Sequence, residues 1–157
     1  MDAARQLLRH TIATLAYRAS RAVRGAPDGF AEFQASGDVR TPGEILAHMG
    51  DLFDWALSSV RGQEQWHGST PLAWPEEMRR FFAALEAFDA YLASDQPLHA
   101  SPEKLFQGPV ADALTHVGQI SILRRLAGAP TGGENFYVAK IAIGVVGTDQ
   151  PAPVYEF

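Results

Sequence analysis

The stretch from Val110 to Leu126 holds side chains whose types and spacing suit metal chemistry. Read as a helix, it places Asp112, His116 and Gln119 on one face, because side chains three and four residues apart are neighbours on a helix. The same face continues as leucine toward the C-terminal end of the stretch. A carboxylate oxygen and an imidazole nitrogen one turn apart can reach one metal ion. The stripe therefore predicts a polar pocket near one end of a helical body, with a closed apolar core beyond it.

A third ligand must come from another helix, and His48 is the candidate. It stands in the apolar stripe of a second amphipathic segment, between Ile45 and Leu52, so it is expected to point inward. The other histidines fall in expected loops or near the polar side of a helix: His10, His67 and His99. The residue pattern thus favours His48, Asp112 and His116 as one ligand set.

Such a set has a defined chemistry and a structural alternative. Two imidazoles and one carboxylate leave coordination positions open, as catalytic rather than structural metal sites do. These ligands suit zinc, iron(II), nickel or manganese. Gln119, Asp51 and Asp54 are candidates to orient the imidazoles or a bound water. The alternative is that Asp112 and His116 form a simple ion pair, and that His48 is a core histidine bonded to a backbone carbonyl.

Four amphipathic helices are expected to position these residues. Thr41, Pro42 and Glu44 form a strong helix start, with an N-cap, a proline at the first helical position and an acid three residues after the cap. Gly108-Pro109 is interpreted as an interruption, with Pro109 as the first residue of the main fourth helix. The expected helices cover about 3–23, 42–61, 75–94 and 109–127, with a long connection before the second and a loop over 63–74.

The predicted fold is all-α: a four-helix bundle over 1–130 and an irregular tail, 131–157, packed on the same domain. Within the tail, 141–146 is apolar and flanked by glycine, which fits a short strand or an extended arm. Glu134, Asn135 and Phe136 follow the last helix closely and are candidates to cover the pocket.

Composition narrows the functional classes. The 157 residues include no cysteine, so the protein has no thiol ligand or thiol nucleophile of its own, and a cytoplasmic location is expected. A net charge of −5 argues against nucleic acid as the main partner, and no apolar run is long enough to span a bilayer. Five arginines in the first 25 residues give this segment the composition of a transit peptide. The apolar residues between them recur with helical spacing, which instead favours an amphipathic helix with the arginines on its solvated side.

The segments "ILAHMGDLFDW" and "DALTHVGQISILRRLAGAP" resemble the DinB-like proteins, relatives of thiol-dependent S-transferases and of mycothiol-dependent maleylpyruvate isomerase. The resemblance covers about residues 1–130. It implies a four-helix bundle with a long connection between its first two helices, usually dimeric. It also implies a metal site with one histidine from helix two, matched by His48, and an HxxxH pair from helix four. His116 matches the second histidine of that pair, and Asp112 stands at the first.

Together these observations predict a divalent-metal-dependent enzyme that activates a small thiol or a water for transfer to an electrophilic small molecule. Any thiol would be a low-molecular-weight cofactor, since the chain has no cysteine. An S-transferase follows from the resemblance, and a hydrolase is the close alternative. Two other functions stay open: a non-catalytic metal or small-molecule binding protein, and a purely structural, dimerising bundle. A homodimer is expected from the resemblance alone.

Overall fold

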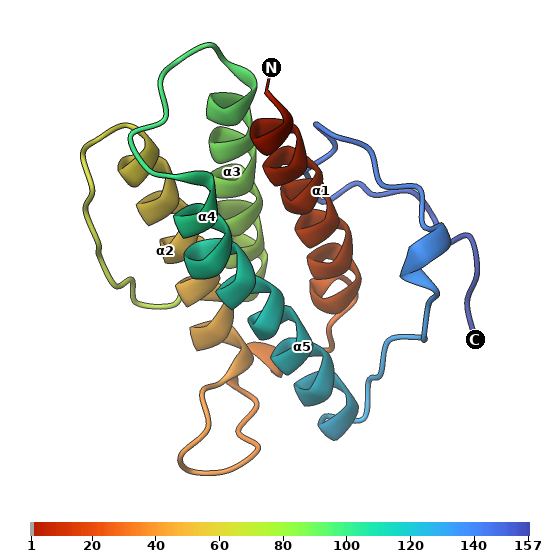
Figure 1. Ribbon diagram of the computed structural model, residues 1–157. Coiled ribbons are helices and arrows are strands. Elements are labelled where there is room, and N and C mark those ends of the chain that lie inside the picture. The colour runs from red at the N-terminus through yellow and green to blue at the C-terminus, as the bar shows by residue number, and fades with distance from the viewer. Residues whose placement is uncertain (1) are drawn as a thin grey trace.

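The computed structural model describes residues 2–157. Its main helices are α1 (Ala3–Val23), α2 (Pro42–Val60), α3 (Trp74–Ala93) and α5 (Ala111–Leu126), with the short α4 (Pro102–Leu105) leading into α5 (Figure 1). Three single-turn segments complete the set: η1 (Phe30–Glu32), η2 (Phe106–Val110) and η3 (Phe136–Val138). Residues 2–157 contain no strand, only an isolated bridge between Glu134 and Glu156. The predicted all-α helical bundle is confirmed.

Local sequence signals set the helix starts. Thr41 Oγ1 accepts from the backbone N of Glu44 at 3.3 Å, and the Glu44 carboxylate accepts from the backbone N of Thr41 at 2.7 Å. This reciprocal cap with Pro42 begins α2 as predicted. Asp2 caps α1 by accepting from the backbone N of Arg5 at 2.8 Å.

The expected boundary at Pro109 is wrong. Helical backbone runs on from Pro102 through η2, a π-helical segment, into α5. Proline has no N–H to donate and its ring crowds the preceding turn, so it cannot sit in a regular α-helix without disturbing the backbone. The wider π turn accommodates Pro109 without ending the helix.

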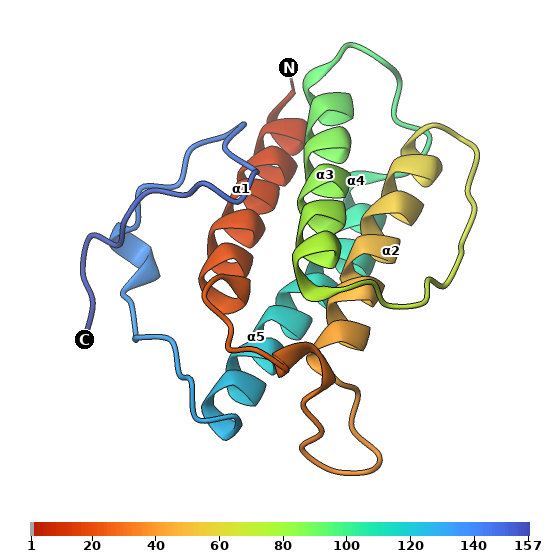
Figure 2. The ribbon, with the colours of Figure 1, turned by 180° about the vertical axis from the view of Figure 1, so that it is seen from behind.

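The helices pack around one apolar core. α1 and α2 each contact both α3 and α5, which gives a four-sided bundle. Figures 1 and 2 show α2 and α3 running in the same direction, so the connection 61–73 must return along the whole length of α2. The interior between the helices is filled by fully buried side chains, among them Ile12, Leu15, Leu46, Met49, Phe53, Phe81, Leu85, Phe88 and Ile120.

Arg124 joins the ends of two helices that are distant in the sequence. Its guanidinium and Nε donate to the backbone carbonyls of Ala22 at 3.1 Å, Arg24 at 2.9 Å, Gly25 at 3.1 Å and Ala129 at 2.8 Å. Three of these carbonyls lie at or just beyond the C-terminus of α1, where backbone oxygens lack helical partners. Burial lowers the pKa of Arg124. The four backbone carbonyls accept hydrogen bonds from the guanidinium N–H groups that burial removes from water.

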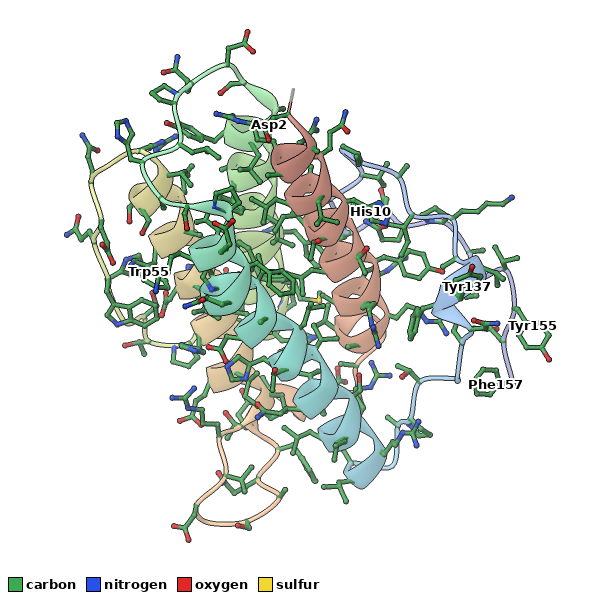
Figure 3. The ribbon with its side chains drawn as sticks, viewed as in Figure 1. Asp2, His10, Trp55, Tyr137, Tyr155 and Phe157 are labelled. Carbon is green, nitrogen blue, oxygen red and sulfur yellow. The ribbon has the colours of Figure 1, made fainter. Side chains whose placement is uncertain are left out.

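The tail lies along the outer side of α1, away from α2 (Figure 1). Figure 3 shows Tyr137, Tyr155 and Phe157 at its outer edge, on the opposite side of the bundle from Trp55. No strand forms over 141–146; this part is an irregular arm with a turn in which Gly144 has a φ of 89°. Only Val146 of this apolar run is buried, so the run lacks the paired neighbour that a strand needs. Among residues 2–157, no helix is both long and apolar enough to cross a bilayer.

Candidate metal centre

The structure brings His48, Asp112 and His116 together. His48 lies on α2 and the other two lie one turn apart on α5. Asp112 Oδ2 is 3.4 Å from His48 Nε2, and Asp112 Oδ1 is 3.4 Å from His116 Nε2. The His116 side chain is 10% exposed, that of His48 22% and that of Asp112 46%. Three ligand atoms from two helices therefore meet at a point that is buried on one side and open on the other.

The two 3.4 Å distances are compatible with shared metal ligation, and the contact between His48 Nε2 and Asp112 Oδ2 is also within hydrogen-bonding distance. Hydrogen bonds between nitrogen and oxygen cluster near about 2.9 Å, and charged ones are shorter. Two ligands held about 2.0–2.1 Å from one tetrahedral ion lie roughly 3.3–3.4 Å apart. The three possible ligand atoms all lie within 4.8 Å of one another. The donor types and their spacing thus fit a divalent transition metal.

Gln119 orients one of the two imidazoles. Its Oε1 lies 2.7 Å from His116 Nδ1, one turn along α5. With the amide oxygen as acceptor, Nδ1 carries the hydrogen, and Nε2 keeps its lone pair on the side of Asp112. Metal-binding histidines usually have such a partner on the second ring nitrogen. Gln119 thus lies beside His116, and its role at a metal stays a prediction.

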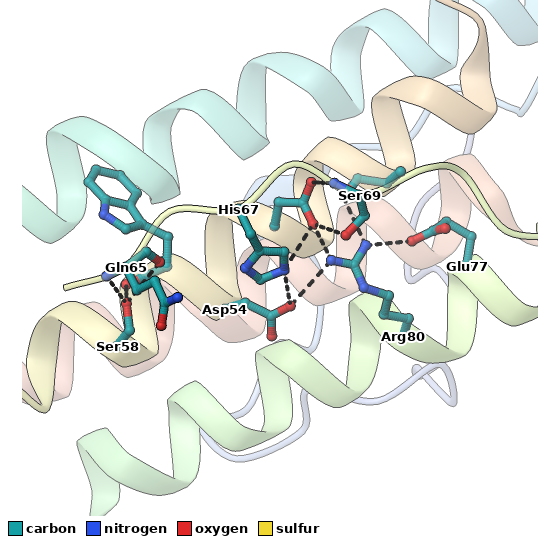
Figure 4. A network of polar contacts seen from close by, with 10 residues as sticks. Asp54, Ser58, Gln65, His67, Ser69, Glu77 and Arg80 are labelled. Carbon is teal, nitrogen blue, oxygen red and sulfur yellow. Dashed lines mark hydrogen bonds and ion pairs between the residues drawn. The ribbon is translucent and has the colours of Figure 1, made fainter. Parts of the chain in front are cut away.

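Asp51 and Asp54 do not support the imidazoles, and the sequence-based expectation for them is corrected. Both contact Arg80 of α3 and, at 3.5 Å each, Nε2 of His67 (Figure 4). Asp51 is buried, and its carboxylate accepts from the backbone N of Ser69 at 2.8 Å and from Ser69 Oγ at 2.7 Å. The two aspartates follow His48 by three and six residues, and the helix turns them toward α3 and the connection 61–73.

We call the group of Asp51, Asp54, His67, Ser69 and Arg80 the loop anchor. Burial raises the pKa of Asp51, but hydrogen bonds from Ser69 and Arg80 outweigh it and leave the pKa below its ordinary value. Three possible metal ligands also lie close together here, those of Asp51, Asp54 and His67. The Arg80 guanidinium already pairs with both aspartates, and with Glu77 at 2.8 Å. The Arg80 guanidinium therefore supplies the positive charge that a metal ion would bring here. The contacts of Asp51 and Asp54 with Ser69 and His67 hold the connection 61–73 on α2.

The anchored connection places an aromatic wall over the centre. The ring of Trp66 lies 5.7 Å from that of His48 in an edge-to-face arrangement, and 6.1 Å from the ring of Trp55. Trp55 Nε1 in turn donates to Glu64 Oε1 at 3.1 Å. Trp66 remains 50% exposed, so it covers His48 without sealing it from solvent. Reasoning from the sequence missed this wall, and its only signal was the run Trp66-His67 inside a connection.

An apolar cavity of about 480 Å³ adjoins the centre on its His116 side. His116 and Gln119 form its polar end, and its apolar lining comes from α2, α5 and the connection 24–41: Ala35, Val39, Ile45, Ile122, Leu123 and Leu126. Asp38 and Arg40 add charge to the lining. We call this space the apolar cavity.

The tail does not cover the apolar cavity, contrary to expectation. The Glu134 carboxylate instead accepts from the Tyr17 hydroxyl at 2.5 Å and pairs with Arg21 Nε at 2.9 Å, both on α1. The guanidinium of Arg18 stacks over the ring of Phe136, with Arg18 Cζ 4.2 Å from the ring centre. The loop residues that line the apolar cavity come from the connection 24–41 and not from the tail.

Comparisons of the chain with protein-family models, with curated proteins and with solved structures found no match. What can be inferred about function therefore depends on the site itself.

Proposed function

We propose that this protein is a divalent-metal-dependent enzyme of the DinB-like type, in which His48, Asp112 and His116 hold the metal. The observation that carries the proposal is the placement of an imidazole, a carboxylate and a second imidazole within 4.8 Å of one another, from two helices. Zinc, iron(II), nickel and manganese all accept this donor set. The open side at Asp112 would leave room for a further ligand.

A divalent ion held there would lower the pKa of a bound thiol or water and so supply a nucleophile near neutral pH. The chain's own residues have supporting tasks. Gln119 fixes the ring of His116 through Nδ1, and Trp66 shields one edge of His48 from water. The protein has no cysteine, so a thiol nucleophile would enter as a low-molecular-weight cofactor.

The apolar cavity would hold the electrophile. Its volume of about 480 Å³ suits a small organic molecule, and its aliphatic walls favour an apolar body. Arg40 would attract a carboxylate on that molecule. The nucleophile would attack from the His116 end, where the cavity and the metal centre meet. Transfer of a thiol to such a substrate is the favoured reaction, and hydrolysis by an activated water is the alternative.

One observation favours a second candidate, a structural bundle without catalysis. Asp112 approaches both imidazoles with one oxygen each, so protonated histidines could bond to it and form a polar bridge between α2 and α5. A protein that binds a metal or small molecule without turnover would use the same residues. The homodimer expected from the resemblance is also kept as a proposal, and every ligand named above comes from one chain.

The decisive experiment is the metal content of the untagged protein, measured by elemental mass spectrometry. We expect about one equivalent of a transition metal in the wild type and a loss of most of it in His48→Ala and Asp112→Ala. His10→Ala is the matched control, because His10 is exposed on α1. The proposal is overturned if the wild type cannot be loaded with any of the four metals. It is also overturned if the two ligand variants bind metal as the control does.

A further inference from the structure

The apolar cavity is elongated and follows one side of α5. Its lining takes five residues from this helix: His116, Gln119, Ile122, Leu123 and Leu126. Between His116 and Leu126 the helix rises about 15 Å, because each residue adds about 1.5 Å. The first two residues of the series are polar and the last three are aliphatic. The cavity therefore has one polar end, at the metal centre, and an apolar length beyond it.

The apolar lining has a buried part and an exposed part. Ile45 and Leu123 are buried. Three large aliphatic side chains of the lining are exposed instead: Val39 at 42%, Ile122 at 60% and Leu126 at 61%. Aliphatic side chains that gather in water beside a cavity form the kind of surface that a bound molecule covers. The apolar surface thus continues from the inside of the cavity out to its mouth.

The connection 24–41 gives the cavity an ordered wall. The side-chain amide of Gln34 donates to the backbone carbonyl of Ser36 and, at 2.6 Å, to that of Val39. The backbone N of Val39 also donates to the carbonyl of Ser36 at 3.2 Å. These bonds hold the turn that carries Ala35 and Val39, which both line the cavity. The shape of the cavity is therefore formed before a ligand enters, as is usual for small-molecule sites.

The length and polarity of the cavity select the shape of its ligand. An extended alkyl chain advances about 1.25 Å per carbon, since its C–C bonds of about 1.5 Å meet at tetrahedral angles, so about 15 Å corresponds to about twelve carbons. A compact ring at the His116 end would leave Ile122 and Leu126 in water. An unbranched chain with one polar end matches the polar end and covers both exposed side chains.

We propose that the electrophilic substrate is an amphiphile with an unbranched hydrocarbon chain of about eight to twelve carbons. Its polar, reactive end lies at His116, and its chain lies along α5 as far as Leu126. The assignment of this molecule as a substrate rests on the proposed metal-dependent function. Binding of the chain needs only the cavity, so it can be measured without a metal.

The test follows isoleucine methyl groups by NMR in the full-length protein, labelled at the δ1 methyl carbon and stripped with a chelator. The probes are 1-alkanols from hexanol to dodecanol, which are uncharged and unreactive. Ile45 and Ile122 line the cavity, whereas Ile141 and Ile143 lie in the tail. We expect saturable shifts of the first two signals, assigned with Ile45→Val and Ile122→Val, and fixed signals for the tail. The affinity should rise about two- to fourfold with each added carbon, because each methylene leaves water.

Variants at the far end of the cavity test the direction of the chain. Leu126→Ser should weaken dodecanol binding about fivefold, because the end of the chain loses an apolar contact. Hexanol should bind this variant as it binds the wild type, since its chain of about 8 Å ends before Leu126. Leu7→Ser is the matched control: Leu7 is 67% exposed and lines a separate apolar groove between α1 and α4. It should leave both affinities unchanged.

The proposal is refuted if Ile45 and Ile122 show no saturable shift, or if the affinity does not rise with chain length. It is refuted equally if Leu126→Ser and Leu7→Ser bind dodecanol alike. Sedimentation of the wild type as a dimer that Leu126→Ser dissociates would also overturn it, because a second copy would then cover this surface. Since no metal is present, a negative result leaves the metal-content experiment unaffected. Chain binding by a protein that cannot be loaded with metal would refute the proposed function alone.

Discussion

Tyr17 gives a sharp prediction, because its hydroxyl is buried against a carboxylate. Its side chain is fully buried on α1, and its hydroxyl donates to Glu134 Oε1 over 2.5 Å. Burial raises the pKa of Tyr17 to about 12, and the hydrogen bond to the Glu134 carboxylate adds to the effect. Ionised Tyr17 would face Glu134 with a second negative charge, so the folded protein holds this proton more tightly than the unfolded chain does.

The sign and size of the effect follow from linkage. Between about pH 10 and pH 12 the folded state binds more protons at this site than the unfolded state, so the free energy of unfolding falls as pH rises. A pKa difference of about two units corresponds to about 2.7 kcal/mol. The contribution is fully present below pH 10 and is lost by about pH 12.

The assay is urea unfolding of the wild type and Tyr17→Phe at a series of pH values from about 8 to 12. At pH 8 the variant should be less stable by about 1–3 kcal/mol, because Glu134 Oε1 loses its donor in a buried place. This difference should shrink by about 2–3 kcal/mol toward pH 12, because only the wild type pays for ionising Tyr17. Ultraviolet absorbance should show a tyrosinate step near pH 12 in the wild type that the variant lacks. A stability difference that stays constant over this range would refute the reasoning.

Two further predictions concern the metal centre and the loop anchor. Gln119→Leu should weaken metal binding about 10–100-fold, because His116 loses the partner that holds its ring; competition with a chromophoric chelator measures this, and unchanged affinity would remove Gln119 from the site. Asp51→Asn should cost about 1.5–3 kcal/mol near pH 7, because Arg80 loses a charge-assisted contact with a buried carboxylate and keeps only Glu77 as a buried acidic partner. Since the pKa of Asp51 is lowered, its stabilising effect exists above the ordinary range of aspartate and disappears as pH falls through the lowered pKa. The wild type and Asp51→Asn should therefore converge in acid, and divergence there would contradict the role of this carboxylate.

Features that depend on neighbouring residues in the chain could be read from the sequence. The reciprocal cap of Thr41 and Glu44 is local, so the start of α2 was predictable to the residue. The approach of Asp112 to His116 follows from helix geometry, and the inward direction of His48 follows from the apolar stripe around it. These local rules were enough to name the three residues that the structure brings together.

Features that depend on chain direction could not be read in the same way. The loop over 63–73 was predictable, but nothing in the helical periodicity shows that it returns along α2 and brings Trp66 and His67 beside that helix. For the same reason Asp51 and Asp54 were assigned to the imidazoles rather than to Arg80. The place of the tail depends on contacts with α1 that are distant in the sequence, among them those of Glu134 with Tyr17 and Arg21, and no local pattern predicts them. The sequence predicts a helix start at Pro109 rather than a continuous helix, because a π turn has no simple sequence signature.

The position of Arg124 has a consequence for how the chain reaches its folded state. The carbonyls at the end of α1 accept hydrogen bonds from Arg124, a residue about 100 positions later in the chain. Residues close to α1 in the sequence do not supply these donors. During synthesis these carbonyls can bond only to water until Arg124 has left the ribosome. Contacts this distant in the sequence slow folding, because a long loop must close before they form. Closure of the bundle is therefore tied to its last helix, and shortened chains that end before Arg124 should accumulate as incompletely packed helices rather than as a smaller folded domain.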